Sequence, residues 1–311
     1  MKKLLSALVV IAIALSSGTG YAQMQPDRSI HLTGDVITLP FSVYIYFPFI
    51  DADINGVKGK LMFDTGAQTA LEVDDKRLVL KNGKVTGRGF VGSGQSFQTS
   101  RYDTLEKVTL ANKLSFIDAG PVSGHDFSYM NNITTDILGL VGYNFFKGYI
   151  FKLDYKSSVI TFYKSTLLRQ QSKDFLKGEK IVATLDFELR KLPNHPVIRI
   201  ISGADTLAVS FDTGQLGGLY LTDDMKNQWV AKGDLELSEN SQIGDLKRFT
   251  FPGAVTVIPG KIPVNSPKAA SGANKAIGIT EPNSMTFGYG FLSQYKTVWD
   301  YDDKKIYLLE K

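Results

Sequence analysis

The strongest constraint on this chain is that its sequence repeats itself. Residues 63–66 read Phe-Asp-Thr-Gly, and the same four residues recur at 211–214, 148 positions later. A turn precedes each copy, and a short apolar segment and a pair of acidic residues follow it. A second shared element, at 142–146 and 288–292, comes near the end of each repeat. Two repeats of about 130 residues are too few for a solenoid, so the sequence predicts two related lobes that face each other.

Short apolar segments throughout the chain favour β-structure. Runs rich in Val, Ile, Phe and Tyr recur between glycine-containing turns, as at 41–50, 197–201 and 305–309, and no long segment of the mature chain keeps the period of a helix. Asn55-Gly56 and Asn82-Gly83 are typical of two-residue hairpin turns, whose central positions need positive φ. The sequence therefore predicts a mostly all-β protein.

Composition excludes several kinds of site. The 311 residues contain no cysteine, which excludes disulfide scaffolds, thiolate metal sites and cysteine nucleophiles. His31, His125 and His195 are the only histidines, and turn-like sequences around His125 and His195 predict that both lie in loops. A formal charge of +4 is too small to suggest a nucleic-acid partner. We expect no metal and no cofactor.

The first 22 residues have the pattern of a secretory signal peptide. Lys2 and Lys3 precede an apolar run from Leu4 to about Leu15, and small residues lead to a cleavage point after Ala22. The apolar run is shorter than the roughly 20 residues of a membrane-spanning helix. We therefore expect cleavage of the signal peptide, export to the periplasm or the medium, and no membrane span.

The remaining chain divides at a polar segment between the two repeats. We expect an N-terminal segment at 23–38, a first lobe at 39–164, a linker at 165–180 and a second lobe at 181–311. The linker is rich in charged and amide side chains, which predicts a short helix and a connection rather than core.

Longer segments around the repeated tetrapeptide carry a family signature. Residues 61–67 read Leu-Met-Phe-Asp-Thr-Gly-Ala, and residues 209–215 read Val-Ser-Phe-Asp-Thr-Gly-Gln. Residues 137–139 add an apolar-apolar-glycine element. The chain from about Leu39 to Leu309 resembles the pepsin and retropepsin superfamily of aspartic peptidases. The resemblance implies a bilobed, pepsin-like architecture of two related, closed, barrel-like lobes with short helices, similar to a covalent version of the retroviral dimer.

The resemblance also implies a reaction. Asp64 and Asp212 would meet about 3 Å apart at the lobe interface and share one proton. The pair would activate a water molecule that attacks a peptide bond, so the protein would be an exported aspartic endopeptidase acting on peptides or unfolded protein. Because one chain supplies both aspartates, we expect a monomer.

Four neighbouring residues have implied supporting roles. Thr65 and Thr213 would lock the two loops against each other through their hydroxyl groups. Gly66 and Gly214 would let the backbone approach closely enough for its N–H groups to reach the carboxylates.

Such a site also needs a flap that excludes water. Residues 83–94 form a glycine-rich hairpin whose candidate substrate contacts are Phe90, Gly92, Ser93 and Gly94. The alternative is an ordinary surface hairpin.

Three features of the sequence depart from the family pattern. Met285 stands where the register with the first lobe predicts a glycine. Gln68 and Leu216 stand where a hydroxyl or other polar partner of the aspartate is common, and Leu216 cannot form a hydrogen bond. Ala67 and Gln215 replace the common hydroxyl residues, and without a hydroxyl donor to the ionised carboxylate we expect activity nearer neutral pH.

These departures keep a second function open, a catalytically inactive bilobed module that binds peptides or a partner protein. A glycosidase is disfavoured, because it needs carboxyl groups roughly 5 to 9 Å apart, which matched motif loops do not predict.

Overall fold

The computed structural model describes residues 29–90, 96–202, 205–253 and 255–311. The predicted signal peptide at 1–22 and the flap residues Gly92, Ser93 and Gly94 lie outside the described residues, so these predictions stay untested. Within the described ranges, no helix combines the length and apolar character that crossing a bilayer requires.

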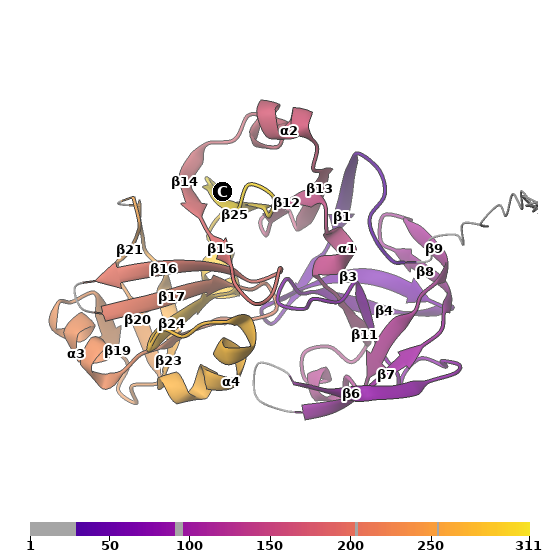
Figure 1. The fold of residues 1–311 in the computed structure, drawn as a ribbon, viewed down its shortest axis with the longest axis horizontal. Coiled ribbons are helices and arrows are strands. Elements are labelled where there is room, and N and C mark those ends of the chain that lie inside the picture. The colour runs from indigo at the N-terminus through magenta and orange to yellow at the C-terminus, as the bar shows by residue number, and fades with distance from the viewer. Residues whose placement is uncertain (1–28, 91–95, 203–204, 254) are drawn as a thin grey trace, which may run out of the picture.

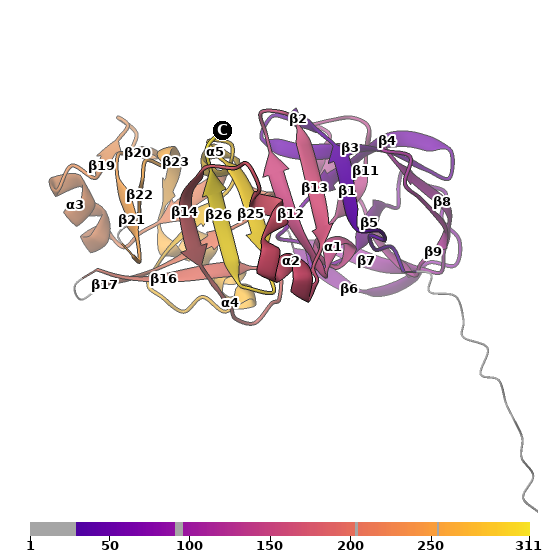
Figure 2. The same cartoon turned by 90° about the horizontal axis from the view of Figure 1, so that it is seen from above.

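The fold consists of one large sheet in each lobe and a third sheet between them (Figures 1 and 2). The first-lobe sheet has ten strands: β2 (Ser42–Tyr44), β3 (Phe47–Ile54), β4 (Val57–Phe63), β5 (Leu71–Asp74), β6 (Lys84–Phe90), β7 (Ser96–Tyr102), β8 (Leu105–Leu110), β9 (Ser115–Ala119), β10 (Val122–His125) and β11 (Ile137–Val141).

The second-lobe sheet has eight strands: β15 (Glu188–Leu189), β16 (Pro196–Ser202), β17 (Asp205–Phe211), β18 (Gly217–Tyr220), β19 (Leu235–Leu237), β20 (Ile243–Leu246), β23 (Gly260–Asn265) and β24 (Asn283–Phe287). A separate two-stranded sheet joins β21 (Phe249–Phe251) and β22 (Val255–Val257).

The sheet between the lobes takes strands from both halves of the chain. In spatial order it contains β1 (Val36–Pro40), β13 (Val159–Lys164), β12 (Tyr149–Asp154), β25 (Lys296–Asp300), β26 (Lys305–Leu309) and β14 (Ile181–Asp186). The helices are short: α1 (Tyr143–Phe146), α2 (Leu167–Ser172), α3 (Asp223–Ala231), α4 (Pro267–Ile277), α5 (Tyr289–Leu292), and the 3₁₀ turns η1 (Ser128–Met130) and η2 (Asp174–Leu176). The prediction of a mostly all-β, bilobed fold with short helices is confirmed.

The two lobes repeat one arrangement of three strands. In the first lobe, β11 lies between β4, to which it is parallel, and β5, to which it is antiparallel. In the second lobe, β24 lies in the same way between β17 and β18. This arrangement places each Asp-Thr-Gly triplet at the end of a buried strand, since Phe63 closes β4 and Phe211 closes β17.

The register of these strands explains why Met285 is tolerated. A bulge in β11 gives Gly139 a φ of 140°, and a Cβ there would lie 1.9 Å from the carbonyl oxygen of Glu72. In the second lobe β24 pairs with β17 in a continuous register, so the equivalent Met285 fits and is fully buried.

One of the two predicted hairpin turns forms. Asn55 and Gly56, with φ of 53° and 84°, join β3 to β4 as expected. The prediction for Asn82-Gly83 is wrong, because these residues lead into β6 without joining two paired strands. There the side chain of Asn82 donates a hydrogen bond of 3.0 Å to Asp103.

The segment between the lobes is fixed by a buried cation. Residues 165–180 contain α2 and η2, and Arg169 of α2 is only 8% exposed. Its guanidinium binds Asp35, which lies just before β1, at 3.1 Å and Asp174 at 2.9 Å. The ion pairs therefore attach this segment to the edge of the shared sheet.

A chain of aromatic contacts links the two motif strands through the shared sheet. Phe63 packs edge-on against Phe151 at 5.5 Å, and Phe151 stacks on Trp299 at 5.3 Å. Trp299 in turn packs edge-on against Phe211 at 6.1 Å. All four side chains are fully buried, so one core supports both motifs.

We expect Trp299→Ala to destabilise the protein by about 3–5 kcal/mol, because it leaves a large cavity in this core. Chemical denaturation would measure the loss. The matched control is Leu168→Ala, since Leu168 is 75% exposed and its truncation should change stability by less than about 0.5 kcal/mol. A loss below about 1 kcal/mol for Trp299→Ala would contradict a shared core at this position.

Candidate active site

Backbone hydrogen bonds hold the two aspartates in equivalent positions. The N–H of Asp64 donates to the carbonyl of Val141 at 3.0 Å, and the N–H of Asp212 donates to the carbonyl of Phe287 at 3.0 Å. Both acceptors lie at the ends of the central strands β11 and β24. Each aspartate is therefore fixed by its own lobe before any contact between the lobes is considered.

The short helices α1 and α5 each form a backbone hydrogen bond with the motif loop of their own lobe. The N–H of Tyr143 in α1 donates to the carbonyl of Ala67, and the N–H of Tyr289 in α5 donates to the carbonyl of Gln215, both at 2.8 Å. Gly288 precedes α5, and a Cβ there would lie 2.0 Å from the Gln215 carbonyl oxygen. This approach explains why glycine stands before each helix in the repeated element.

The two threonines exchange hydrogen bonds across the lobe interface. The N–H of Thr65 donates to the hydroxyl of Thr213, and the N–H of Thr213 donates to the hydroxyl of Thr65, each at 3.0 Å. The Thr213 hydroxyl also donates to the carbonyl of Phe63 at 2.8 Å. Both threonines are completely buried, so these bonds join the loops in a water-free environment.

Each carboxyl group lies against the glycine of the opposite motif. A Cβ on Gly66 would lie 2.4 Å from Oδ2 of Asp212, and a Cβ on Gly214 would lie 2.4 Å from Oδ1 of Asp64. Only glycine leaves room for this packing. The structure thus brings Asp64, Asp212 and the four supporting residues together at one point of the interface.

Backbone and side-chain donors surround the carboxyl groups. Oδ1 of Asp64 accepts hydrogen bonds from the N–H groups of Gly66 at 2.8 Å and Ala67 at 3.3 Å. Oδ1 of Asp212 accepts from the N–H of Gly214 at 2.8 Å. Oδ2 of Asp212 accepts from the side-chain amide of Gln215 at 2.8 Å.

The Gln215 contact corrects one expectation from the sequence. We expected no side-chain donor to a carboxylate at this position because Gln215 has no hydroxyl group. The longer side chain instead reaches Asp212 with its amide, which serves the same electrostatic purpose. Residue type alone could not show this, since the contact depends on how the side chain folds back.

The environment of Asp64 favours its protonated form. Removal from water raises its pKa well above the ordinary value, and the charge of Asp212 and a hydrogen bond between the two carboxyl groups raise it further. The N–H groups of Gly66 and Ala67 act in the opposite direction but do not outweigh these effects. Two carboxyl groups held this closely take up and release protons as a pair.

His195 lies in a loop, as predicted, but the loop contacts the first motif. It precedes β16, and Nε2 of His195 lies 2.9 Å from the carbonyl oxygen of Gly66. The neighbouring Asn194 donates from Nδ2 to the carbonyls of Thr65 at 3.1 Å and Gly66 at 2.8 Å. Neither residue was singled out as functional from the sequence. The Asn-His-Pro run before a strand gives only a turn signal.

The prediction that His125 lies in a loop is wrong. His125 ends β10, is 1% exposed and stacks between Phe97 at 3.7 Å and Phe127 at 4.0 Å. Its Nδ1 lies 3.1 Å from a carboxylate oxygen of Glu72. Parallel pairing of β10 with β5 draws the histidine into the sheet, which the turn-like Gly-His-Asp sequence concealed.

The predicted flap is only partly described. β6 ends at Phe90, which pairs with Ser96 of β7, so the two strands do form a hairpin. The roles proposed for Phe90 and for the residues at the tip stay predictions.

A polar cavity of about 560 Å³ adjoins this hairpin. Phe97 and Gln98 of β7 line one side, and Asp126 and Tyr129 line another. Burial raises the pKa of the Tyr129 hydroxyl, and the charges of Glu72 and Asp64 raise it further. Tyr129 stacks near His125 and Phe127, and no residue of either Asp-Thr-Gly triplet lines this cavity.

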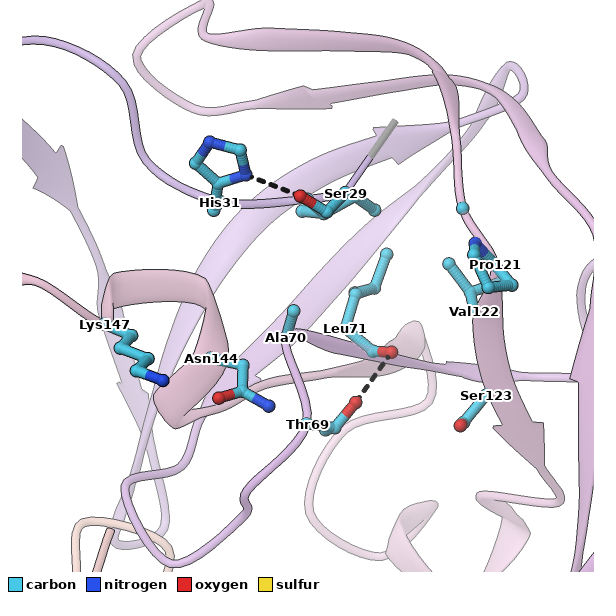
Figure 3. Close-up of a pocket in the computed structure, with 12 residues that line it drawn as sticks. Ser29, His31, Thr69, Ala70, Leu71, Pro121, Val122, Ser123, Asn144 and Lys147 are labelled. Atoms are coloured by element: carbon cyan, nitrogen blue, oxygen red, sulfur yellow. Dashed lines mark hydrogen bonds between the residues drawn. The ribbon is translucent and has the colours of Figure 1, made fainter. Parts of the chain in front are cut away.

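A second cavity, of about 520 Å³, lies elsewhere in the first lobe (Figure 3). Thr69 and Leu71, which follow the first motif loop, line it together with Asn144 and Lys147. None of its lining residues belongs to either Asp-Thr-Gly triplet, so it is separate from the carboxyl pair. Among the described residues, no group of three or more acidic or histidine side chains is placed to hold a metal ion.

We expect Thr213→Val to destabilise the protein by at least about 1–3 kcal/mol, because it leaves a buried N–H and a buried carbonyl without partners. Thr213→Ser keeps the hydroxyl and should lose less. Thr184→Val, at an exposed position of β14, is the control. Equal denaturation midpoints for Thr213→Val and the wild-type protein would contradict this account of the interface.

Comparisons with known proteins give a structural match. No protein-family model matches the sequence, and no curated protein matches it. Among solved structures, the chain is similar to the aspartic proteinase from Irpex lacteus, with a TM-score of 0.52 and 14% identity. The match covers 89% of this chain and 97% of the proteinase. The likeness shows that the chain has a pepsin-like fold.

Proposed function

We propose that the protein is an aspartic endopeptidase that hydrolyses peptide bonds with a water molecule activated between Asp64 and Asp212. The observation that carries the proposal is the mutual packing of the two carboxyl groups, each against the glycine of the opposite motif. Such packing couples their protonation. The fold shared with an aspartic proteinase supports the same reading.

The pair starts the reaction with one shared proton. In the proposed cycle Asp64 carries it, in line with the burial and the neighbouring charge of Asp212 that raise the pKa of Asp64. Oδ1 and Oδ2 of Asp212 accept hydrogen bonds from Gly214 and Gln215. In this cycle the two aspartates take different roles although their motifs are identical.

The reaction then follows with protons conserved. Asp212 takes a proton from the water while the water oxygen adds to the scissile carbonyl carbon, and Asp64 gives its proton to the carbonyl oxygen. The resulting diol collapses by returning a proton to Asp64. Asp212 gives its proton to the amine nitrogen as the C–N bond breaks, and the pair returns to its first state.

Substrate would lie across the pair as an extended peptide or unfolded segment. A hairpin that closes over the site would exclude water during the reaction.

We further propose that the protein is exported after removal of residues 1–22 and acts as a monomer. The two lobes of one chain supply both aspartates, so the reaction needs no second copy.

We expect Asp64→Asn and Asp212→Asn each to lower cleavage of denatured casein by at least about 10³-fold, because neither variant can form a pair that shares one proton. Cleavage should be measured across pH 3–8 with and without pepstatin. Asp224→Asn, at an exposed position of α3, is the control and should keep full activity.

The outcomes separate the two functions that the sequence left open. Undiminished cleavage by either variant would rule out the carboxyl pair. A folded wild-type protein that cleaves no peptide in a broad substrate library, yet binds pepstatin, would favour the inactive binding module.

We expect a bell-shaped pH profile for kcat/KM. Its alkaline limb reports loss of the proton from the pair, and the raised pKa of Asp64 moves this limb toward neutral pH. Gln215→Leu removes a donor to the ionised pair and should move the acid limb to higher pH by about one unit. A wild-type maximum below about pH 4 would contradict this assignment.

A further inference from the structure

We infer that Asn194 and His195 of the second lobe are positioning residues that set the orientation of the first-lobe catalytic loop. This inference rests on the proposed function. It concerns side-chain contacts from the second lobe to the carbonyl groups of the first motif loop.

Two peptide planes of the first motif loop carry these contacts. The carbonyl of Thr65 and the N–H of Gly66 belong to one planar trans peptide unit, and the carbonyl of Gly66 and the N–H of Ala67 belong to the next. In each unit the N–H and the carbonyl point in opposite directions. Both N–H groups point at Oδ1 of Asp64, at 2.8 and 3.3 Å.

The opposite edges of these planes bind the second lobe. Nδ2 of Asn194 donates to both carbonyls, at 3.1 Å to Thr65 and 2.8 Å to Gly66. His195 adds a contact of 2.9 Å to the Gly66 carbonyl. Each plane is thus held between a carboxyl group of the first lobe and a donor of the second, and it cannot rotate without breaking a bond on one side.

The contact also fixes the form of His195. A carbonyl oxygen can only accept, so Nε2 of His195 must carry a proton. Burial lowers the pKa of His195, against the opposing influence of Asp212 and the Gly66 carbonyl, which favours the neutral ring protonated at Nε2.

The asparagine is itself rigidly held. Asn194 is completely buried, and its backbone carbonyl accepts a hydrogen bond of 3.2 Å from the hydroxyl of Tyr301, which follows β25 of the shared sheet. The loop that carries Asn194 is therefore anchored to the sheet between the lobes.

The matching positions of the first lobe hold neither an amide nor an imidazole. The 148-residue spacing of the repeat relates Asn194 to Tyr46 and His195 to Phe47. Tyr46 packs its ring against that of Tyr289 at 5.7 Å, and phenylalanine has no polar side-chain atom. At these positions the second lobe thus supplies hydrogen-bond donors to the first motif, whereas the first lobe supplies aromatic rings.

The decisive experiment compares His195→Phe, His195→Gln and Asn194→Asp with the wild-type enzyme. Phenylalanine keeps the ring and removes the donor, whereas glutamine places an amide N–H near the position of Nε2. Asn194→Asp keeps the shape but replaces a donor by a carboxylate. Asn240→Asp, at an exposed turn of the second lobe, is the control.

We expect His195→Phe and Asn194→Asp to lower kcat about tenfold or more with KM changed less than about threefold, because the loop is misaligned and substrate contacts remain. His195→Gln should recover most of the loss. Unchanged kcat in His195→Phe, or no recovery in His195→Gln, would overturn the inference.

A second readout does not depend on catalysis. Titration of the ¹³C-labelled Asp64 carboxyl group by NMR should show a higher pKa in His195→Phe than in the wild-type protein, because misdirected N–H groups no longer lower it. An unchanged titration would overturn the inference. If the wild-type protein cleaves nothing but the titration shifts, the proposed function fails and the positioning role stands.

Discussion

The reciprocal hydrogen bonds between Thr65 and Thr213 are the interaction on which the rest of the site depends. They join two loops from different lobes in a fully buried environment, where an unpaired N–H would be costly. These bonds bring Gly66 against the carboxyl group of Asp212 and Gly214 against that of Asp64. The aromatic contacts from Phe63 to Phe211 link the two motif strands, so packing and hydrogen bonding together place the aspartates at one point.

Much of this fold could be predicted from the repeat, because a duplicated β-rich unit with matched motifs has few compact arrangements. The tight turn at Asn55-Gly56 also followed from local backbone preference. Asn82 has the positive φ of 60° that its turn signal favours, but the strands on its two sides do not pair into a hairpin. At His125 parallel pairing of β10 with β5 outweighed the turn signal. Met285 was puzzling only until the uninterrupted pairing of β24 showed that no glycine is needed.

The candidate site was less accessible to prediction than the fold. The six motif residues lie together in the structure, but the groups that tune them come from elsewhere in the sequence. Asn194 and His195 reach the first motif through the folding of whole lobes, and single polar residues in turns carry no pattern that marks them. The sequence showed only that Gln215 lacks a hydroxyl group. That its amide donates to Asp212 depends on a side-chain conformation, which the sequence does not reveal.

The pairing of Asn194 and His195 against Tyr46 and Phe47 has a consequence for how such a molecule can change. In a symmetric homodimer, every substitution occurs twice, so a donor gained on one side of the junction also appears on the other. Once both halves reside in one polypeptide, each can be altered separately. A single asparagine can then affect one aspartate alone, so selection can give the two aspartates different roles.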